Sequence, residues 1–97
     1  MNRYKGRSGA KAIERENPNI VEMPVPDGGL GKRLDAMHLF HLQLGIKAAH
    51  GEGRYEEGRH YIRWCFADPQ HARSFQALFG GELIVRPDAH LAPSRRR

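Results

Sequence analysis

The stretch Arg59–Gly81, RHYIRWCFADPQHARSFQALFGG, predicts a strand, a capped helix and a glycine turn in direct succession. Its first part, Tyr61–Phe66, is rich in aromatic and β-branched residues, which suit a half-buried strand. Alternate side chains of a strand point to opposite faces, and burying a lone arginine is costly, so we expect the apolar set in the core. The apolar set is Ile62, Trp64 and Phe66, and the opposite set is Tyr61, Arg63 and Cys65.

A helix follows this strand, and the sequence marks both its start and its end. Asp68 stands at the N-cap position, where its carboxylate can accept from a backbone N–H, and Pro69 suits the first helical position. Gly80 and Gly81 allow the left-handed turn that ends a helix, and Glu82–Val85 returns to an extended pattern. This unit predicts two parallel strands with a right-handed crossover. Its helix carries an apolar stripe of Ala72, Phe75, Leu78 and Phe79.

The remaining elements complete a small α+β domain. Ile20–Val25 predicts a strand that points Glu22 away from the core, and residues 30–44 predict an amphipathic helix. Ile46–His50 is a candidate strand that would form a hairpin with Arg59–Phe66. The order is then βαββαβ, which predicts a ferredoxin-like two-layer sandwich with two helices on one face of a four-stranded antiparallel sheet. Without Ile46–His50 the order reduces to βαβαβ.

We expect this domain to cover residues 19–86, with a flexible basic arm at residues 1–18 and a flexible basic tail at residues 87–97. A chain of 97 residues allows one domain with a modest core. The sequence has no apolar run long enough to span a bilayer and no signal-peptide pattern. A single cysteine fits a reducing compartment, so we expect a cytoplasmic protein.

The net charge of +5 is concentrated at the two ends of the chain. Residues 1–15 carry five basic residues and one acidic, residues 86–97 carry four basic and one acidic, and residues 16–85 carry seven basic and nine acidic. Basic segments on a neutral body can hold phosphate backbones by releasing counterions, or they can be solvated tails that aid solubility. We predict contacts to nucleic acid or to an acidic protein partner at Arg3, Lys5, Arg7, Lys11, Arg95, Arg96 and Arg97.

The sheet face opposite the helices is a second candidate surface. In element order the chain resembles RNA-recognition domains, which stack bases on strand aromatics. Arg59, Tyr61 and Phe66 fit their strand signature, whereas His60 replaces a glycine and Arg63 stands where a second aromatic is usual. We therefore add Tyr61 and Arg63 to the predicted nucleic-acid or partner contacts. An open sheet on a small core also suits a second subunit, which predicts a homodimer through this face.

The loop Asp27–Arg33, DGGLGKR, leads into the N-terminus of the first long helix. Backbone N–H groups and the helix dipole can hold an anion at such a place. The loop lacks the glycine spacing and the Ser/Thr of a P-loop, and it lacks the dinucleotide fingerprint. A turn that needs glycine geometry is the alternative. The candidate anion-binding residues are Gly29, Gly31, Lys32 and Arg33.

Four of the histidines and the cysteine are the remaining residues with metal-binding or nucleophilic chemistry. His38 and His41 are three positions apart on the predicted helix, and His50 and His60 could meet across the hairpin. No cysteine or carboxylate completes a metal-site spacing. Cys65 and His60 point to opposite faces of their strand, and a strand cysteine is commonly a small apolar residue. We therefore predict no metal site, no cofactor and no catalytic residue.

The chain is similar to small uncharacterised bacterial proteins that carry a strand–DP–helix–FGG signature. The similarity lies in WCFADPQHARSFQALFGG and in the preceding run IVEMPVPDGGLGKRLDAMHLFH, so it covers most of residues 20–85. The resemblance implies no activity.

These observations favour a non-enzymatic binding module whose basic ends engage nucleic acid or an acidic protein. One alternative is a small enzyme or ligand-binding domain that uses a pocket between sheet and helices, with histidines or Cys65. Another is a structural subunit of a larger bacterial assembly.

Overall fold

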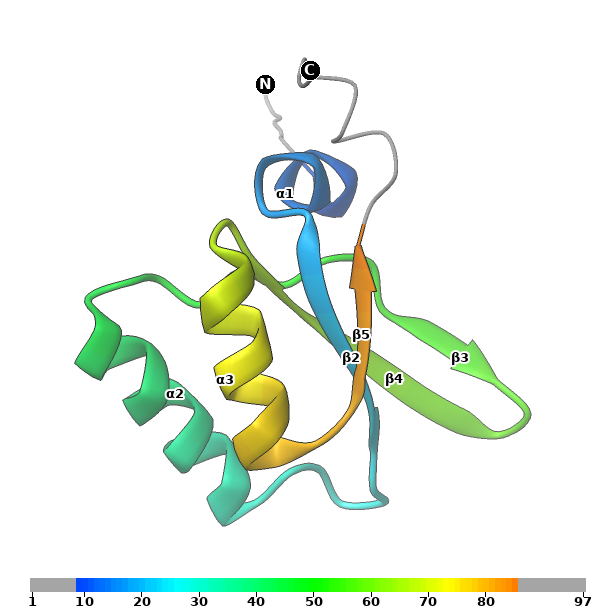
Figure 1. Ribbon diagram of the computed structural model, residues 1–97. Coiled ribbons are helices and arrows are strands. Elements are labelled where there is room, and N and C mark those ends of the chain that lie inside the picture. Colours follow the sequence, from blue (N-terminus) through cyan, green and yellow to red (C-terminus); the bar gives the residue numbers. More distant parts are fainter. Residues whose placement is uncertain (1–8, 86–97) are drawn as a thin grey trace, which may run out of the picture.

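Residues 9–85 form three helices and a four-stranded antiparallel sheet, and these are the residues that the computed structural model describes (Figure 1). No helix in this part of the chain is long and apolar enough to cross a membrane. In chain order the elements are α1 (Ala10–Glu16), β2 (Asn19–Val25), α2 (Lys32–Leu44), β3 (Arg54–Glu56), β4 (Arg59–Phe66), α3 (Pro69–Phe79) and β5 (Glu82–Val85).

The strands lie in the order β3–β4–β2–β5. Strand β2 runs antiparallel to both β4 and β5, so β4 and β5 are parallel to each other with β2 between them. The predicted parallel relation of these two strands is therefore confirmed. Asn19, at the start of β2, pairs with both Phe66 and Val85, and we call this end of the strands the Asn19 end. At the other end of the strands, which we call the Val25 end, Val25 pairs with His60.

The core lies between one face of the sheet and helices α2 and α3. Trp64 is fully buried and Phe66 is 2% exposed, while Ile62 packs partly buried against them, so the predicted core face of β4 is confirmed. Helix α2 contributes Met37 to this core, and α3 contributes Phe75. The other buried residues of the cluster are Val21, Met23 and Ala72.

Helix α3 begins and ends where the sequence predicts. The Asp68 carboxylate oxygen Oδ1 accepts a hydrogen bond of 2.8 Å from the backbone N–H of Gln70, and Pro69 occupies the first turn. At the other end, the backbone N–H of Gly80 donates to the carbonyl oxygen of Gln76 at 2.7 Å. This cap and glycine exit explain why α3 crosses the sheet without a long loop on either side.

The turn from α3 into β5 passes close to β2 at Gly81. We expect Gly81→Ala to lower the free energy of unfolding by about 1–3 kcal/mol more than Gly80→Ala, because overpacking costs that much. Both glycines have positive φ, so both substitutions strain the backbone. A Cβ at Gly81 would lie 2.8 Å from the Glu22 carbonyl oxygen and 2.9 Å from Val21 Cγ1. A Cβ at Gly80 would have no such neighbour within 4 Å among the described residues. Urea denaturation of the two variants measures the difference, and equal losses would contradict this close approach.

The prediction of a strand at Ile46–His50 is wrong, and the partner of β4 in the hairpin is Arg54–Glu56. The hairpin turns at Glu57 and Gly58, which both have positive φ, as a two-residue hairpin of right-handed twist requires. Residues 49–51 nevertheless lie alongside β4, where one isolated bridge joins His50 to Trp64. The sequence Lys47–Ala49 favours a strand poorly, which explains why the pairing stops at that bridge.

The flexible arm predicted for residues 1–18 is helical from Ala10 to Glu16, so that part of the prediction is also wrong. The reason is a long-range contact: Glu14 is only 1% exposed and its carboxylate pairs with Arg63 of β4. Helix α1 ends at Glu16, just before Asn17 and Pro18, because the residue that precedes a proline disfavours the helical conformation. The rest of the arm, residues 1–8, and the tail predicted at residues 87–97 lie outside the described residues.

Candidate functional site

A network of charged side chains covers the sheet face opposite α2 and α3. At its centre is Glu22, which is 5% exposed and is the register partner of Arg63. Arg54 donates to both Glu22 carboxylate oxygens, from Nε at 3.1 Å and from Nη2 at 3.0 Å. Arg63 Nε donates to Glu22 at 3.0 Å, and Arg63 Nη1 donates to both Glu14 oxygens at 3.1 Å. The hydrogen bond from Arg54, with help from Arg63, holds the pKa of Glu22 below its ordinary value despite burial.

This network determines what the predicted contact residues Tyr61 and Arg63 can offer to a partner. Both lie on the predicted face, but the Arg63 donors serve two carboxylates of the same chain. The Arg54 guanidinium carbon lies 4.0 Å from the centroid of the Tyr61 ring, so that ring is partly covered by a cation. Arg54 also pairs with exposed Glu56. The face therefore presents paired charges around one half-buried aromatic ring.

Toward the Asn19 end, the same face changes from charged to apolar. Ile20 is fully buried and Cys65 is 2% exposed, and Ile20 pairs in register with both Cys65 and Ile84. Half-buried Ile13 of α1 and Cys65 line one shared depression of about 790 Å³. Helix α1 therefore lies beside the apolar row that a sheet-to-sheet dimer would use. The homodimer through this face stays a prediction.

Both ends of the described chain lie at the Asn19 end of the sheet. Strand β5 finishes at Val85, the register partner of Asn19, and two residues join α1 to Asn19. Figure 1 shows α1 and the end of β5 at the same end of the sheet. Lys11 and Arg15 are exposed on α1 at this end. Of the predicted contacts in the two terminal segments, only Lys11 lies in the described part. The others, Arg3, Lys5, Arg7, Arg95, Arg96 and Arg97, lie outside it.

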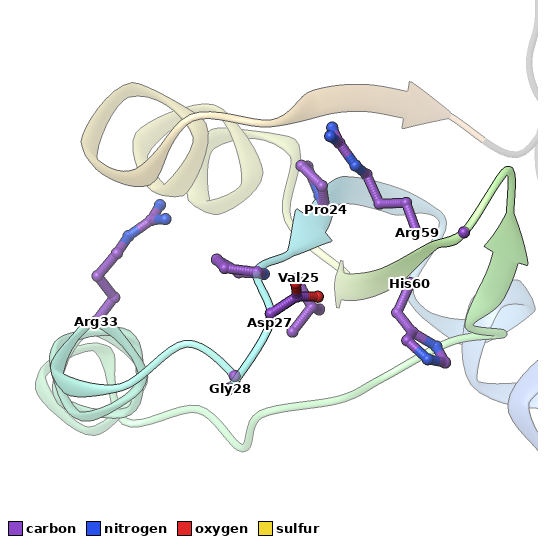
Figure 2. A pocket seen from close by; sticks show the side chains of 10 residues that line it. Pro24, Val25, Asp27, Gly28, Arg33, Arg59 and His60 are labelled. Carbon is purple, nitrogen blue, oxygen red and sulfur yellow. The ribbon is translucent and has the colours of Figure 1, made fainter.

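A depression of about 740 Å³ lies at the Val25 end, between the loop after β2 and the start of β4. Figure 2 shows Arg33 and Arg59 on two sides of it, with Asp27 between them. Arg33 Nη2 donates to the carbonyl oxygen of Phe79 at 2.7 Å and so ties α2 to the end of α3. The Asp27 carboxylate in the lining opposes the binding of an anion.

The predicted anion-binding residues are only partly brought together by this depression. Gly29 and Arg33 line it. Gly31 is the N-cap of α2 and provides no side chain to accept from the backbone N–H groups, and Lys32 is exposed. A loop built on glycine geometry, the alternative considered from the sequence, is compatible with the positive φ of Gly28, Gly29 and Gly31.

The histidines are separated by the fold. His41 is 3% exposed, its Nδ1 lies 2.8 Å from the Met37 carbonyl oxygen, and its ring stacks on Phe66. His38 is exposed on the same helix. His50 and His60 do not meet across the hairpin, because the His50 ring packs on Trp64 and the His60 ring on Tyr55. Within residues 9–85 no three His, Cys, Asp or Glu side chains are grouped to hold a metal ion.

Sequence reasoning missed Glu14, the most buried charged side chain of the described chain. The spacing of Ala10, Ile13 and Asn17 at i, i+3 and i+7 is the one local signal of a helix face there. Nothing near Glu14 in the sequence points to Arg63, which is 49 residues away.

The chain matches no protein-family model, no curated protein and no solved structure. The resemblance to proteins with a strand–DP–helix–FGG signature therefore stays a prediction.

Proposed function

We propose that this chain is a non-enzymatic binding module that holds nucleic acid through basic residues gathered at one end of a neutral domain. The distribution of charge supports the proposal. Residues 9–85 carry nine basic and ten acidic residues, residues 1–8 carry three basic and no acidic residues, and residues 86–97 carry four basic and one acidic. Attraction to a polyanion is therefore concentrated outside the domain body.

The observation that carries the proposal is that both basic segments join the domain at the Asn19 end. Asn19 and Val85 are paired residues, and α1 adds exposed Lys11 and Arg15 beside them. The points at which the two basic segments are attached to the domain thus lie at the same end of the sheet. A single phosphate backbone can neutralise such charges together and release its counterions.

The packing of the sheet against the helices supports a binding role over a catalytic one. Trp64, Phe66 and Phe75 fill this interface. The ring centroid of Phe75 lies 5.2 Å from that of Trp64 and 5.3 Å from that of Phe66. The two depressions described above lie at the ends of the sheet. The alternative of an enzyme that uses a pocket between sheet and helices is therefore disfavoured, because aromatic rings fill that interface.

We also propose that the fold belongs to the ferredoxin-like class. Apart from α1, the elements follow the order βαββαβ, and β2 lies between β4 and β5. Helices α2 and α3 pack on one face of the sheet. This arrangement is the split βαβ order of that class.

Fluorescence anisotropy with a labelled single-stranded oligouridylate tests the proposed function. We expect affinity to fall steeply with added salt. Neutralising three terminal cations in the full chain, by Arg95→Gln, Arg96→Gln and Arg97→Gln, should weaken binding and make the slope of log K against log salt shallower by about 2, at about 0.7 per contact. The matched control is Lys32→Gln, Arg59→Gln and Arg73→Gln, which removes the same charge from exposed sites of the domain body.

Two results would contradict the proposal. One is the absence of binding at low salt. The other is an equal or larger loss in the control variant, which would place the anion contact on the domain body, with the depression at the Val25 end as one location. An excess of polyglutamate that competes as well as unlabelled oligouridylate would indicate an acidic protein partner instead.

A further inference from the structure

Helix α1 is held on the sheet by a buried carboxylate. Glu14 is 1% exposed, both of its oxygens accept from Arg63 Nη1 at 3.1 Å, and Oε2 also accepts from the backbone N–H of Glu52 at 2.7 Å. It packs directly against Gly51, where an added Cβ would lie only 2.2 Å from Glu14 Oε2. Three segments of the chain therefore meet at this one side chain.

Little else in the described chain fixes α1. The helix has seven residues, fewer than an isolated helix needs to persist in water. Its N-cap is Gly9, which makes no side-chain capping bond, and its apolar side chains, Ala10, Ala12 and Ile13, are only half-buried. The position of α1 on the sheet therefore depends on the contacts of Glu14.

The outer side of α1 is cationic. Lys11 and Arg15 are one helical turn apart and both are exposed, so their Cβ atoms are neighbours at about 6 Å. Ile13 lies on the opposite side of the helix, toward the depression that it shares with Cys65. With α1 in place, both cations lie on a helix at the Asn19 end, the end at which β5 also finishes (Figure 1).

We infer that Glu14 is a positioning residue for a nucleic-acid contact surface on α1. Its contacts with Arg63 and Glu52 hold Lys11 and Arg15 in a fixed place, where they meet the phosphate backbone of a bound strand. This inference rests on the proposed function and names the described part of its binding surface. A fixed pair of cations binds more tightly than the same pair on a released segment, because less conformational entropy is lost on binding.

The direction in which one substitution changes the affinity for nucleic acid distinguishes this inference from an effect of net charge alone. Glu14→Gln removes a negative charge, and on charge alone a polyanion would bind the variant more tightly. Loss of the anchor predicts the opposite, a weaker complex. Glu16→Gln is the matched control, since Glu16 is an exposed carboxylate on the same helix. Gly51→Ala adds a test without any change of charge, because its methyl group would displace the Glu14 carboxylate, and Gly51 has no positive φ that alanine would strain.

Anisotropy of the labelled oligouridylate at low salt, with the full chain, measures all of these variants. We expect Glu14→Gln and Gly51→Ala to bind about fivefold more weakly than the unaltered chain, since ordering long side chains on binding costs about that much. Glu16→Gln should bind equally or more tightly. Tighter binding by Glu14→Gln would overturn the inference. Far-UV circular dichroism confirms that each variant remains folded.

A second set of variants distinguishes positioning from a general loss of structure. Lys11→Gln with Arg15→Gln changes two exposed side chains, leaves the fold intact, and should itself weaken binding about fivefold. In this background Glu14→Gln should cause no further loss, because there are no cations left on α1 to position. A full additional loss, or no effect of the double substitution, would overturn the inference while leaving the proposed function intact. Failure of the unaltered chain to bind would instead overturn the proposed function.

Discussion

Replacement of Trp64 by alanine is expected to remove most of the free energy of unfolding of the protein at room temperature. Trp64 is fully buried, and its ring centroid lies 4.4 Å from that of His50, 5.2 Å from that of Phe75 and 5.4 Å from that of His41. Truncating a buried tryptophan costs about 3–5 kcal/mol. A small domain has a total stability of about 5 kcal/mol or somewhat more, so the loss removes most of it. Urea denaturation followed by far-UV circular dichroism measures the change, because the variant lacks the only tryptophan.

The matched control is Leu42→Ala on α2, where the side chain is 75% exposed. Its cost should remain within about 0.5 kcal/mol, as for most surface substitutions. Trp64→Phe should cost less than Trp64→Ala, because it keeps a ring in the site and removes an indole N–H that has no hydrogen-bond partner within residues 9–85. If Trp64→Ala were as mild as Leu42→Ala, the placement of β4 against α2 and α3 would be wrong.

The central part of the fold could be predicted because its signals are local. The alternation in β4 separates Trp64 and Phe66 from Arg63, and the burial cost of arginine decides which set faces the core. Asp68 and Pro69 mark the start of α3 within two residues. Each of these signals depends only on residues that are close in the sequence, so each could be recognised without the structure.

The elements that the sequence did not predict depend on distant partners. Residues 54–56 form β3 because a two-residue turn at Glu57 and Gly58 returns the chain onto β4, although the glutamate at the first turn position is not a typical turn residue. Helix α1 depends on the contact of Glu14 with Arg63. A seven-residue polar segment gives no local reason to expect a buried carboxylate.

The candidate site was predictable in charge but not in geometry. The sequence shows that the ends of the chain are basic, whereas only the structure shows that Asn19 and Val85 are paired, so that β5 finishes at the same end of the sheet at which β2 begins. Arg63 was a predicted partner contact, but its guanidinium serves Glu14 and Glu22. Pairing of this kind follows from strand register, which depends on the whole sheet.

Acidification from about pH 7 toward about pH 5 is expected to destabilise the protein, and His41 is expected to account for much of the effect. Burial among the aromatic rings of the core lowers the pKa of His41, and burial likewise lowers the pKa of His50. Below the ordinary histidine pKa of about 6.5 the unfolded chain binds protons that the folded chain does not, so the free energy of unfolding falls as the pH falls. The loss ends only below the depressed pKa of the folded protein, and it amounts to at most about 1.4 kcal/mol per pH unit for each histidine. Glu22 adds a separate loss at lower pH, because its lowered pKa makes its contribution disappear only as the pH falls through that value.

Urea denaturation at a series of pH values tests this expectation with His41→Leu and, as the matched control, His60→Leu at an exposed position of β4. His41→Leu removes both the titrating ring and a buried Nε2 that has no hydrogen-bond partner in the described part of the chain. The slope of stability against pH between about 5 and 6.5 should therefore become shallower by up to about 1.4 kcal/mol per pH unit, whatever the change in absolute stability.

The residual slope belongs to His50, whose ring lies on the same Trp64 side chain, so His41→Leu with His50→Leu should flatten the curve further. An unchanged slope in His41→Leu would mean that the ring is charged or solvated in the folded protein, which is incompatible with its stacking on Phe66 in the core.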